Sequence, residues 1–479
     1  MTKQITIHLI DEVNVYFEGL NKKQTDHIIS KTERTVKGAY QTAAYRLGKW
    51  NGKESQFRQD GYTFSYLAPT VMDILFDDFF VGEDTIDIID HRTPLPTAVE
   101  SIPYIDKDFL SNTGKTLHEH QVNATNAVIE NHKGVVHATT SSGKSLIILA
   151  IAKSFDSCFK SLTIVPNTSL VDQIEKDFQS EGTLKYACVR SKHSSEQRKE
   201  IIENHDHIIM TWRLLNNCSE FLEGFDGVIM HDELHQCGDV MYSLYKTTLS
   251  EAPVRVGLTA SLPKDKQKKE KILCHLGGGE LINVGTKELQ DKGLIADSDI
   301  TILPIHDPHL DSEFPDWDKE FKYIQKNKRR VNSIAGYVDH LPKKNTVVLC
   351  NRKTGIELAQ HLNAPFIDKD VSEERRAELY KMFNDHDNCM LVATYGTVGT
   401  GISIDRIFRI ITLDMGKDIT KVIQGIGRGL RKDGTVDYLE VIDMYSELKY
   451  GKRHVRDRIK FYKEKQYKYK ISPSKLVVE

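Results

Sequence analysis

The sequence lacks any apolar run approaching the ~18 residues that a membrane-spanning helix needs, and its longest apolar stretches are short ones such as Leu146 to Ala152. The opening residues, MTKQITIHLIDEV, carry an Asp and a Glu where a signal peptide would need an uncharged apolar segment. Its 30 Gly and 13 Pro show no period, which excludes collagen-like and low-complexity chains. We therefore expect a soluble, cytoplasmic protein that does not associate with membranes.

Cysteine is also scarce. The chain has seven, an odd number, and no CxxC pair, so a disulfide framework is excluded and the thiols are expected to be reduced and buried. The formal net charge is only −3, but its distribution is uneven. Ten Lys or Arg lie between Lys449 and Lys470 against only Asp457 and Glu464, and such a basic segment on an acidic body favours a polyanionic partner.

The 479 residues are enough for about three domains at ~150 residues each. Residues 1–110 alternate apolar and polar positions in hairpin-like runs and predict a small α/β accessory domain. Within it, residues 31–58 hold seven Lys or Arg against two Glu, interleaved with aromatic residues, which favours binding to duplex or branched DNA. From residue 111 onward, apolar strands alternate with helical segments in two sets, 111–297 and 298–448, so we expect two α/β lobes with parallel sheets in series.

Residues 449–479 are expected to form a basic, aromatic C-terminal tail. The segment Lys449 to Lys470 is predicted to be a helix whose cations lie along phosphates. Its aromatic side chains could pack on the second lobe or stack on an unpaired base.

A phosphate-binding loop follows the apolar strand that ends at His137. The loop, ATTSSGKS from Ala138 to Ser145, precedes an apolar helix, and this strand-loop-helix order is that of a P-loop, with Ala138 in place of the usual first Gly. Backbone N–H groups of such a loop wrap a phosphate, while Lys144 supplies charge for the outer phosphates and Ser145 offers a hydroxyl to Mg²⁺.

An acidic pair, Asp232 and Glu233, stands in GVIMHDELH at the carboxyl end of another apolar strand. Ligands of open α/β sheets bind at these strand ends. We expect Asp232 to hold the Mg²⁺ shell and Glu233 to orient or deprotonate the attacking water.

A glycine-rich segment near the end of the second lobe, QGIGRGLRKDG, carries two arginines. Gln424, Arg428 and Arg431 have the spacing of one helical face, and a guanidinium is suited to γ-phosphate charge because it is rigid, bidentate and always protonated. These three residues are predicted to join the catalytic set.

Together these motifs resemble those of superfamily 2 DExH helicases, over about Thr116 to Met444. ATTSSGKS corresponds to motif I, DELH to motif II, TAS at Thr259 to Ser261 to motif III and QGIGRGLR to motif VI. The resemblance implies two tandem RecA-like lobes that use ATP and Mg²⁺. It also implies a nucleotide-binding set that consists of Gln121, Thr140, Ser141, Ser142, Gly143, Lys144, Ser145 and Gly401. His120 and Ser403 differ from the residues that the family often has at those positions.

The same resemblance implies that nucleic acid lies against Pro166, Thr211, Trp212 and Thr394. The accessory domain extends this resemblance beyond the motor. A small domain that carries YRLGKWNGK and precedes a DExH motor is most similar to the arrangement in phage recombination helicases. That similarity implies ATP-driven remodelling of branched DNA, including Holliday junction branch migration, fork regression and unwinding of D-loops or R-loops. Lys49 and Trp50 would then contact DNA that is branched, duplex or single-stranded, with RNA as a partner in R-loops.

Three other functions fit parts of the sequence. A duplex translocase of a restriction-type system would need a nuclease, for which Asp443, Glu447 and Lys449 form the one candidate string. An RNA helicase is an alternative because contacts to the backbone distinguish RNA from DNA poorly. A nucleic-acid-binding protein with an inactive ATPase is disfavoured because Lys144 and the acidic pair are intact.

Overall fold

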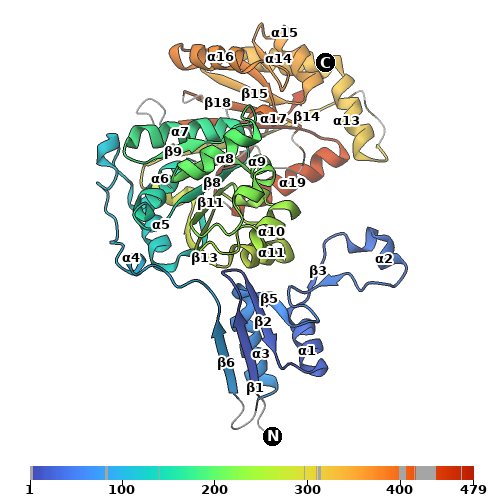
Figure 1. Cartoon of the computed structure of the whole chain (residues 1–479). Helices are drawn as coiled ribbons and strands as arrows, with labels where there is room; N and C mark the ends of the chain where they lie inside the picture. The colour runs from blue at the N-terminus through green and yellow to red at the C-terminus, as the bar shows by residue number, and fades with distance from the viewer. Residues whose placement is uncertain are drawn as a thin grey trace. The chain divides into compact units, whose positions relative to one another are not determined.

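The structure, a computed structural model, describes residues 4–80, 85–139, 141–295, 297–308, 310, 314–398, 406–414, 416, 438–464 and 466–479 (Figure 1). The chain divides into two compact units. The first comprises Met1–Ala138 with Gly143–Asn283, and the second comprises Thr139–Ser142 with Val284–Glu479. Among the described residues, no helix combines the length and apolar character that crossing a membrane requires.

The accessory domain is built on a four-stranded sheet of order β5-β2-β1-β6. The strands are β1 (Gln4–Leu9), β2 (Asn14–Glu18), β5 (Tyr62–Phe64) and β6 (Thr85–Asp90). β1 and β2 form the predicted antiparallel hairpin, while β6 runs parallel to β1. Alternate residues of the hairpin are buried with residues of α1 (Lys22–Thr32) and α3 (Ala68–Asp78), which together form the core of this domain.

Residues 34–54, which we name the arm, project from the accessory domain (Figure 1). The base of the arm is the two-stranded antiparallel sheet of β3 (Arg34–Thr35) and β4 (Lys53–Glu54). Its tip carries the short helices η1 (Ala39–Gln41) and α2 (Ala43–Arg46). Gly52 has φ +78°, and a Cβ there would lie 2.9 Å from the ring of Tyr45, so the arm closes tightly only with glycine at this position.

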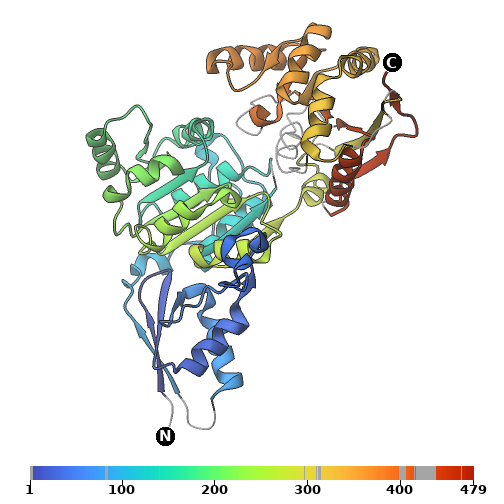
Figure 2. The ribbon, with the colours of Figure 1, turned by 90° about the vertical axis from the view of Figure 1, so that its right-hand side faces the viewer.

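The first motor lobe completes the first unit with a seven-stranded sheet of order β13-β7-β12-β11-β8-β10-β9. The strand pairs from β7 to β9 are parallel, as the alternation of strands and helices predicts, and helices cover the sheet (Figure 2). The strands are β7 (Lys133–Ala138), β8 (Ser161–Val165), β9 (Tyr186–Cys188), β10 (His207–Thr211), β11 (Val228–Asp232), β12 (Val254–Thr259) and β13 (Glu280–Val284). The helices are α4 (Thr97–Glu100), η3 (Ser111–Thr113), α5 (Glu119–Asn131), α6 (Lys144–Phe155), α7 (Thr168–Glu181), α8 (Ser195–Asn204), α9 (Trp212–Asn217), η4 (Ser219–Phe221), η5 (Leu234–Gln236), α10 (Asp239–Lys246) and α11 (Lys266–Leu276); η2 (Ser65–Leu67) leads into α3.

The second unit contains an eight-stranded sheet of order β16-β17-β15-β18-β19-β14-β20, with β21 also paired to β14. The strand pairs among its described residues are parallel. The strands are β14 (Asp297–His306), β15 (Thr346–Cys350), β16 (Phe366–Ile367), β17 (Met390–Thr394), β18 (Arg409–Leu413), β19 (Tyr438–Ser446), β20 (Lys468–Ile471) and β21 (Leu476–Val477). The helices are α12 (Thr286–Asp291), α13 (Trp317–Lys326), α14 (Lys328–His340), α15 (Arg352–His361), α16 (Glu373–Asp385), α17 (Tyr395–Val398) and α19 (Lys449–Glu464).

The segment predicted as a tail is an integral part of this second lobe. Helix α19 packs on β19, and β20 and β21 extend the sheet beside β14. Tyr462, Tyr467 and Val478 are buried. The sequence left two roles open for the aromatic residues of this segment, which were packing on the second lobe and stacking on a base. Because Tyr462 and Tyr467 are buried, they pack within the second lobe. The second unit also begins at Val284, earlier than residue 298, because the chain joins it directly after β13.

Candidate ATP-binding and nucleic-acid site

The carboxyl ends of five neighbouring strands of the first lobe lie level with one another. Leu258 of β12 pairs with Asp232 on one side and with Val136 on the other, and Thr211 of β10 pairs with Val165 of β8. Because these strands are parallel, the segments that follow them share one edge of the sheet. The phosphate loop, the acidic pair, Thr259, Pro166 and Thr211 are therefore brought to the same edge, as predicted.

The phosphate loop leads into α6 with two residues in the left-handed region. Ser141 has φ +66°, and Gly143, the N-cap of α6, has φ +78°. A Cβ at Gly143 would lie 2.2 Å from Nε2 of Gln121, so a side chain at this position is excluded by space as well as by conformation. Lys144 and Ser145 then begin the helix, where N–H groups are available to an anion. Thr140 lies outside the described residues.

Gln121 packs directly beneath this loop. Its side chain is 2% exposed, and its Oε1 accepts the N–H of His118 at 2.8 Å as part of a capping box on α5. His120 is buried as well and stacks on His118, with ring centroids 5.8 Å apart. The capping bond fixes one end of the Gln121 amide and leaves the other beside Gly143. A contact between Gln121 and adenine stays a prediction.

The acidic pair stands at the end of β11, with Asp232 as its last residue and Glu233 directly after it in a strained conformation. Asp232 is 6% exposed, and its Oδ1 accepts the N–H of Glu233 at 2.9 Å. Burial, together with the neighbouring Glu233 carboxylate, raises the pKa of Asp232 to about 7, against the opposing effect of Lys144. Glu233 has φ +54°, which is unfavourable for a residue with a Cβ and is typical of functional positions. Its Oε1 lies 3.9 Å from Nζ of Lys144.

A histidine that the sequence analysis did not single out supports Glu233. Nδ1 of His235 lies 3.3 Å from Oε2 of Glu233 and 3.0 Å from Oγ1 of Thr259. The Thr259 hydroxyl in turn donates to the carbonyl of Ser261 at 3.0 Å and accepts its N–H at 3.2 Å. Motif II is thus joined to motif III by hydrogen bonds. His235 is the last residue of the DELH motif, and this position was the sequence signal that could have identified it.

The residues at this edge fit Mg²⁺ and the phosphates of a nucleotide. Mg²⁺ in such sites is bound by one or two protein oxygens, waters and phosphate oxygens, so it does not require a cluster of protein ligands. Within the described part of the chain, no group of three His, Cys, Asp or Glu is placed to hold a metal. A cation held beside this buried carboxylate would oppose the effects of burial and of Glu233 and lower the pKa of Asp232.

The predicted nucleic-acid residues are distributed over three places. Pro166 follows β8 and Thr211 ends β10 at the edge already described, and Trp212 is half-buried against the core of the first lobe. Thr394 ends β17 in the second unit, where its Oγ1 lies 2.7 Å from that of Thr397. Lys49 and Trp50 lie on the arm, with Lys49 exposed and the indole N–H of Trp50 donating to the carbonyl of Lys53 at 2.8 Å.

The remaining predicted site residues cannot be placed. Gly401, Ser403, Gln424, Arg428 and Arg431 lie outside the described residues. Their roles stay predictions from the motifs.

The candidate nuclease string is not supported by the structure. Asp443 is fully buried, and its two carboxylate oxygens accept hydrogen bonds from Arg458 at 2.8 and 2.9 Å and from the Tyr462 hydroxyl at 3.1 Å. A carboxylate with these partners is part of the core of the second lobe and is not available to a metal ion. Five of the seven cysteines are buried, as expected, whereas Cys158 and Cys389 are only partly buried.

Comparisons with known proteins agree with this architecture. Residues 114–264 match the family described as type III restriction enzyme, res subunit, and residues 329–433 match the helicase conserved C-terminal domain. The ATP-dependent DNA helicase UvsW of Enterobacteria phage T4 is 25% identical over 391 residues, which cover 74% of this chain and 76% of the relative. The crystal structure of T4 UvsW aligns with 99% of this chain and 100% of its own, at 19% identity and a TM-score of 0.47.

A DNA-bound type ISP restriction-modification enzyme, LlaBIII, aligns with 84% of this chain and 34% of its own, at 14% identity and a TM-score of 0.58, and this likeness shows the fold. The two helicase family matches fall on the two RecA-like lobes, and motifs I, II and III meet at one sheet edge. The chain therefore belongs to the superfamily 2 helicases, and it is an ATPase of that superfamily.

Proposed function

We propose that this protein is an ATP-driven DNA helicase that remodels branched DNA, by Holliday junction branch migration, fork regression and unwinding of D-loops or R-loops. The observation that carries the proposal is the arm, an exposed basic and aromatic structure in the same compact unit as the ATP-binding lobe. The name of the phage relative, an ATP-dependent DNA helicase, supports DNA as the substrate, and its source supports the cytoplasm of a bacterial host as the place of action.

ATP hydrolysis is assigned to the edge of the first lobe. Lys144 neutralises the outer phosphates, and Ser145 and Asp232 hold Mg²⁺, which supplies charge neutralisation for phosphoryl transfer. Glu233 orients the attacking water and accepts its proton. His235 helps to position Glu233, because it lies next to one carboxylate oxygen while Lys144 lies next to the other.

The second lobe supplies the remaining positive charge in this proposal. Arg428 and Arg431, with Gln424, reach the γ-phosphate when the lobes close on ATP, and an arginine in that role raises turnover by ~10³ to 10⁵. Pro166, Thr211 and Thr394 hold the backbone of the tracked strand, which makes binding independent of sequence.

The arm has the chemistry of a DNA-binding element. Between the two strands at its base, residues 36–52 hold three cations, Lys37, Arg46 and Lys49, and no carboxylate. Tyr40 and Tyr45 are 64% and 43% exposed. Cations bind phosphates of either strand, whereas exposed aromatic rings stack on bases only where a duplex is open. The combination favours a junction, where duplex arms and unpaired bases meet, over a linear duplex.

The proposal is tested by measuring ATP turnover on a four-way junction, linear duplex, single-stranded DNA and single-stranded RNA. An arm variant in which Lys37, Arg46 and Lys49 are replaced by Gln should lose the preference for the junction and keep turnover on single-stranded DNA. A matched variant with three exposed lysines outside the arm changed to Gln serves as the control, using Lys199, Lys319 and Lys343. An arm variant that keeps the wild-type junction preference would contradict the proposed role.

The ATP site is tested separately. Lys144→Ala should abolish turnover on every nucleic acid while DNA binding persists, because the DNA-binding surfaces are unchanged. Substantial turnover in that variant would show that the phosphate loop is misassigned. Strand displacement without cleavage distinguishes a helicase from a restriction-type translocase, the second candidate that the match of residues 114–264 keeps open.

A further inference from the structure

The two strands at the base of the arm both contact one helix of the motor lobe. Arg34 of β3 forms an ion pair with Glu270 at 2.9 Å between Nε and Oε2. Glu54 of β4 accepts a hydrogen bond on Oε2 from Nε2 of Gln267 at 2.8 Å. Gln267 and Glu270 are both on α11, so the arm is attached to this helix through each of its strands.

The carboxylate of Glu270 depends on Arg34 for a compensating charge, and the partial burial of Glu270 makes this dependence stronger. Burial raises the pKa of Glu270, and Arg34 opposes this effect. The Glu270 side chain is 16% exposed, against 37% for Arg34. Removal of the guanidinium would leave a half-buried carboxylate without its cation, which is costly. The pair is therefore more than an exposed surface contact, whose contribution would be small.

Helix α11 is also the element that follows motif III. Strand β12 ends at Thr259, and the chain reaches the N-cap of α11 at Asp265, whose Oδ1 accepts the N–H of Lys268 at 2.9 Å. Thr259 is bonded to His235, which contacts Glu233. A series of contacts thus leads from the carboxylate assigned to water activation to the base of the arm: the 3.3 Å approach of His235 to Glu233, the hydrogen bond from His235 to Thr259, and the chain from Thr259 into α11.

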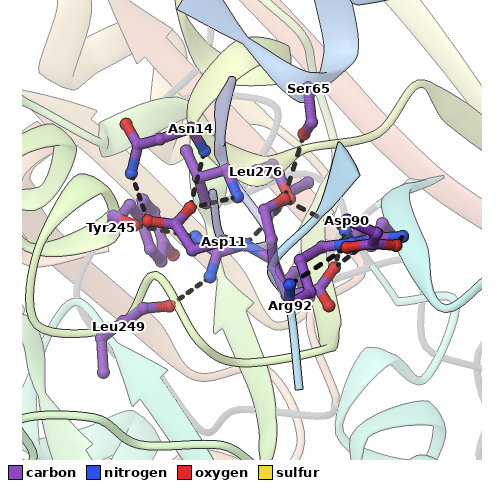
Figure 3. Close-up of polar contacts among 12 residues, drawn as sticks. Asp11, Asn14, Ser65, Asp90, Arg92, Tyr245, Leu249 and Leu276 are labelled. Atoms are coloured by element: carbon purple, nitrogen blue, oxygen red, sulfur yellow. Dashed lines mark hydrogen bonds and ion pairs between the residues drawn. The ribbon is translucent and has the colours of Figure 1, made fainter. Parts of the chain in front are cut away.

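A second attachment joins the accessory domain to the first lobe at residues outside α11. The turn between β1 and β2 inserts Glu12 into the first lobe, where Lys133 binds both its carboxylate and its carbonyl and Arg92 lies 3.4 Å from its Oε2. The carbonyl also accepts the Ser65 hydroxyl, and the N–H of Glu12 donates to the carbonyl of Ser250. Figure 3 shows Ser65, Asp90 and Arg92 converging with residues of the motor lobe at this place.

Apolar contacts accompany these polar ones. Val13, Phe64 and Leu67 of the accessory domain form a cluster with Cys274, and the Phe64 ring lies 4.4 Å from that of His275. Cys274 and His275 are again residues of α11. The accessory domain is therefore attached both at the Glu12 turn and along α11.

We propose that α11 links the arm to the ATP site, with Arg34, Glu54, Gln267 and Glu270 as positioning residues through which DNA held by the arm alters the alignment of Glu233. The proposal rests on the proposed function in assigning DNA to the arm. A displacement of α11 moves the Thr259–Ser261 segment that holds His235, and small misplacements of catalytic groups have large effects on rate. By reciprocity, a nucleotide bound at the ATP site should also change the state of the arm base.

Charge exchange across the Arg34–Glu270 pair provides the test. Arg34→Glu and Glu270→Arg are each expected to lower the ratio of junction-stimulated to single-strand-stimulated ATP turnover by about tenfold, the order of typical couplings between sites. The double variant restores opposite charges and should recover the ratio to within about twofold. Turnover on single-stranded DNA should be unchanged throughout, which a merely destabilised lobe would not show.

Two further variants guard against misfolding and general charge effects. Gln267→Ala removes the hydrogen bond to Glu54 without a charge reversal and should lower the same ratio. Exchange of the exposed Lys199–Glu203 pair on α8, in the same lobe, should not change it. Equal losses on junction and single-stranded DNA, or a double variant without recovery, would overturn the proposal.

A readout without DNA separates this inference from the proposed function. Binding of a non-hydrolysable ATP analogue to the wild-type chain should slow amide hydrogen exchange in residues 33–36 and 52–55. The single charge reversals should remove this protection and the double variant should restore it. Wild-type protein that shows no junction preference but retains nucleotide-dependent protection would refute the proposed function alone, whereas absence of protection in the wild type would refute the link through α11.

Discussion

Replacement of Arg458 by Met should destabilise the second lobe strongly. Asp443 and Arg458 are both 0% exposed, and the guanidinium donates two hydrogen bonds to the carboxylate. Although burial alone would lower the pKa of Arg458, the Asp443 carboxylate raises it. Loss of one member of such a pair leaves an uncompensated buried charge and costs ~3–5 kcal/mol. At ~2–4 °C per kcal/mol for a unit of this size, we expect the melting temperature to fall by about 6–20 °C.

Scanning calorimetry of the full chain measures this effect, because only the transition of the second unit should move. Arg456→Met is the matched control, since Arg456 lies on the same helix but is exposed, and its change should be within ~0.5 kcal/mol. An Asp443→Asn, Arg458→Met double variant should regain part of the loss, because the orphaned charge is gone. Equal melting temperatures for Arg458→Met and Arg456→Met would refute the reasoning.

Three further outcomes are expected. Glu233→Gln should bind ATP with near-normal affinity but hydrolyse it at least ~100-fold more slowly in single-turnover measurements, and loss of nucleotide binding would show that its role is misassigned. The pKa of Asp232 is raised to about 7, and Mg²⁺ requires the ionised form of this carboxylate. The affinity for Mg²⁺-ATP, measured by titration, should therefore weaken about tenfold from pH 8 to pH 6. Asp232→Asn should remove that pH dependence. Replacement of Lys452, Arg456 and Lys460, an exposed stripe on α19, by Gln should reduce the slope of log affinity against log salt by ~3, and an unchanged slope would exclude this stripe from the DNA track.

The ATP site could be predicted from the sequence because its parts are local. Lys144 follows a strand and begins a helix, and Asp232 and Glu233 end a strand, so each motif is readable within about ten residues and the parallel sheet brings them together. His235 lies in the same local motif, DELH, but its role depends on Thr259 of another strand, and a contact of that kind leaves no local pattern.

The last part of the chain was harder to predict for a different reason. The cations of α19 dominate its composition, and a helix with exposed Lys and Arg on one side resembles a solvated tail. Its other side carries Arg458 and Tyr462, which are buried with Asp443. The sequence alone does not distinguish a buried Arg from an exposed one. In the same way, Glu12 lies in a turn next to Asp11 and has the pattern of a solvated acid, although it forms the main polar contact with the motor lobe.

The packing of the accessory domain on α11 has a consequence for synthesis. Val13, Phe64 and Leu67 leave the ribosome roughly 200 residues before Cys274, the residue that covers them, and at ~5–20 residues per second the delay is about 10–40 s. During that interval the nascent chain exposes an apolar patch that has no partner yet. The accessory domain therefore completes its surface only when translation has passed the first lobe, so the yield of folded protein should depend on growth temperature and on chaperones that shield this patch.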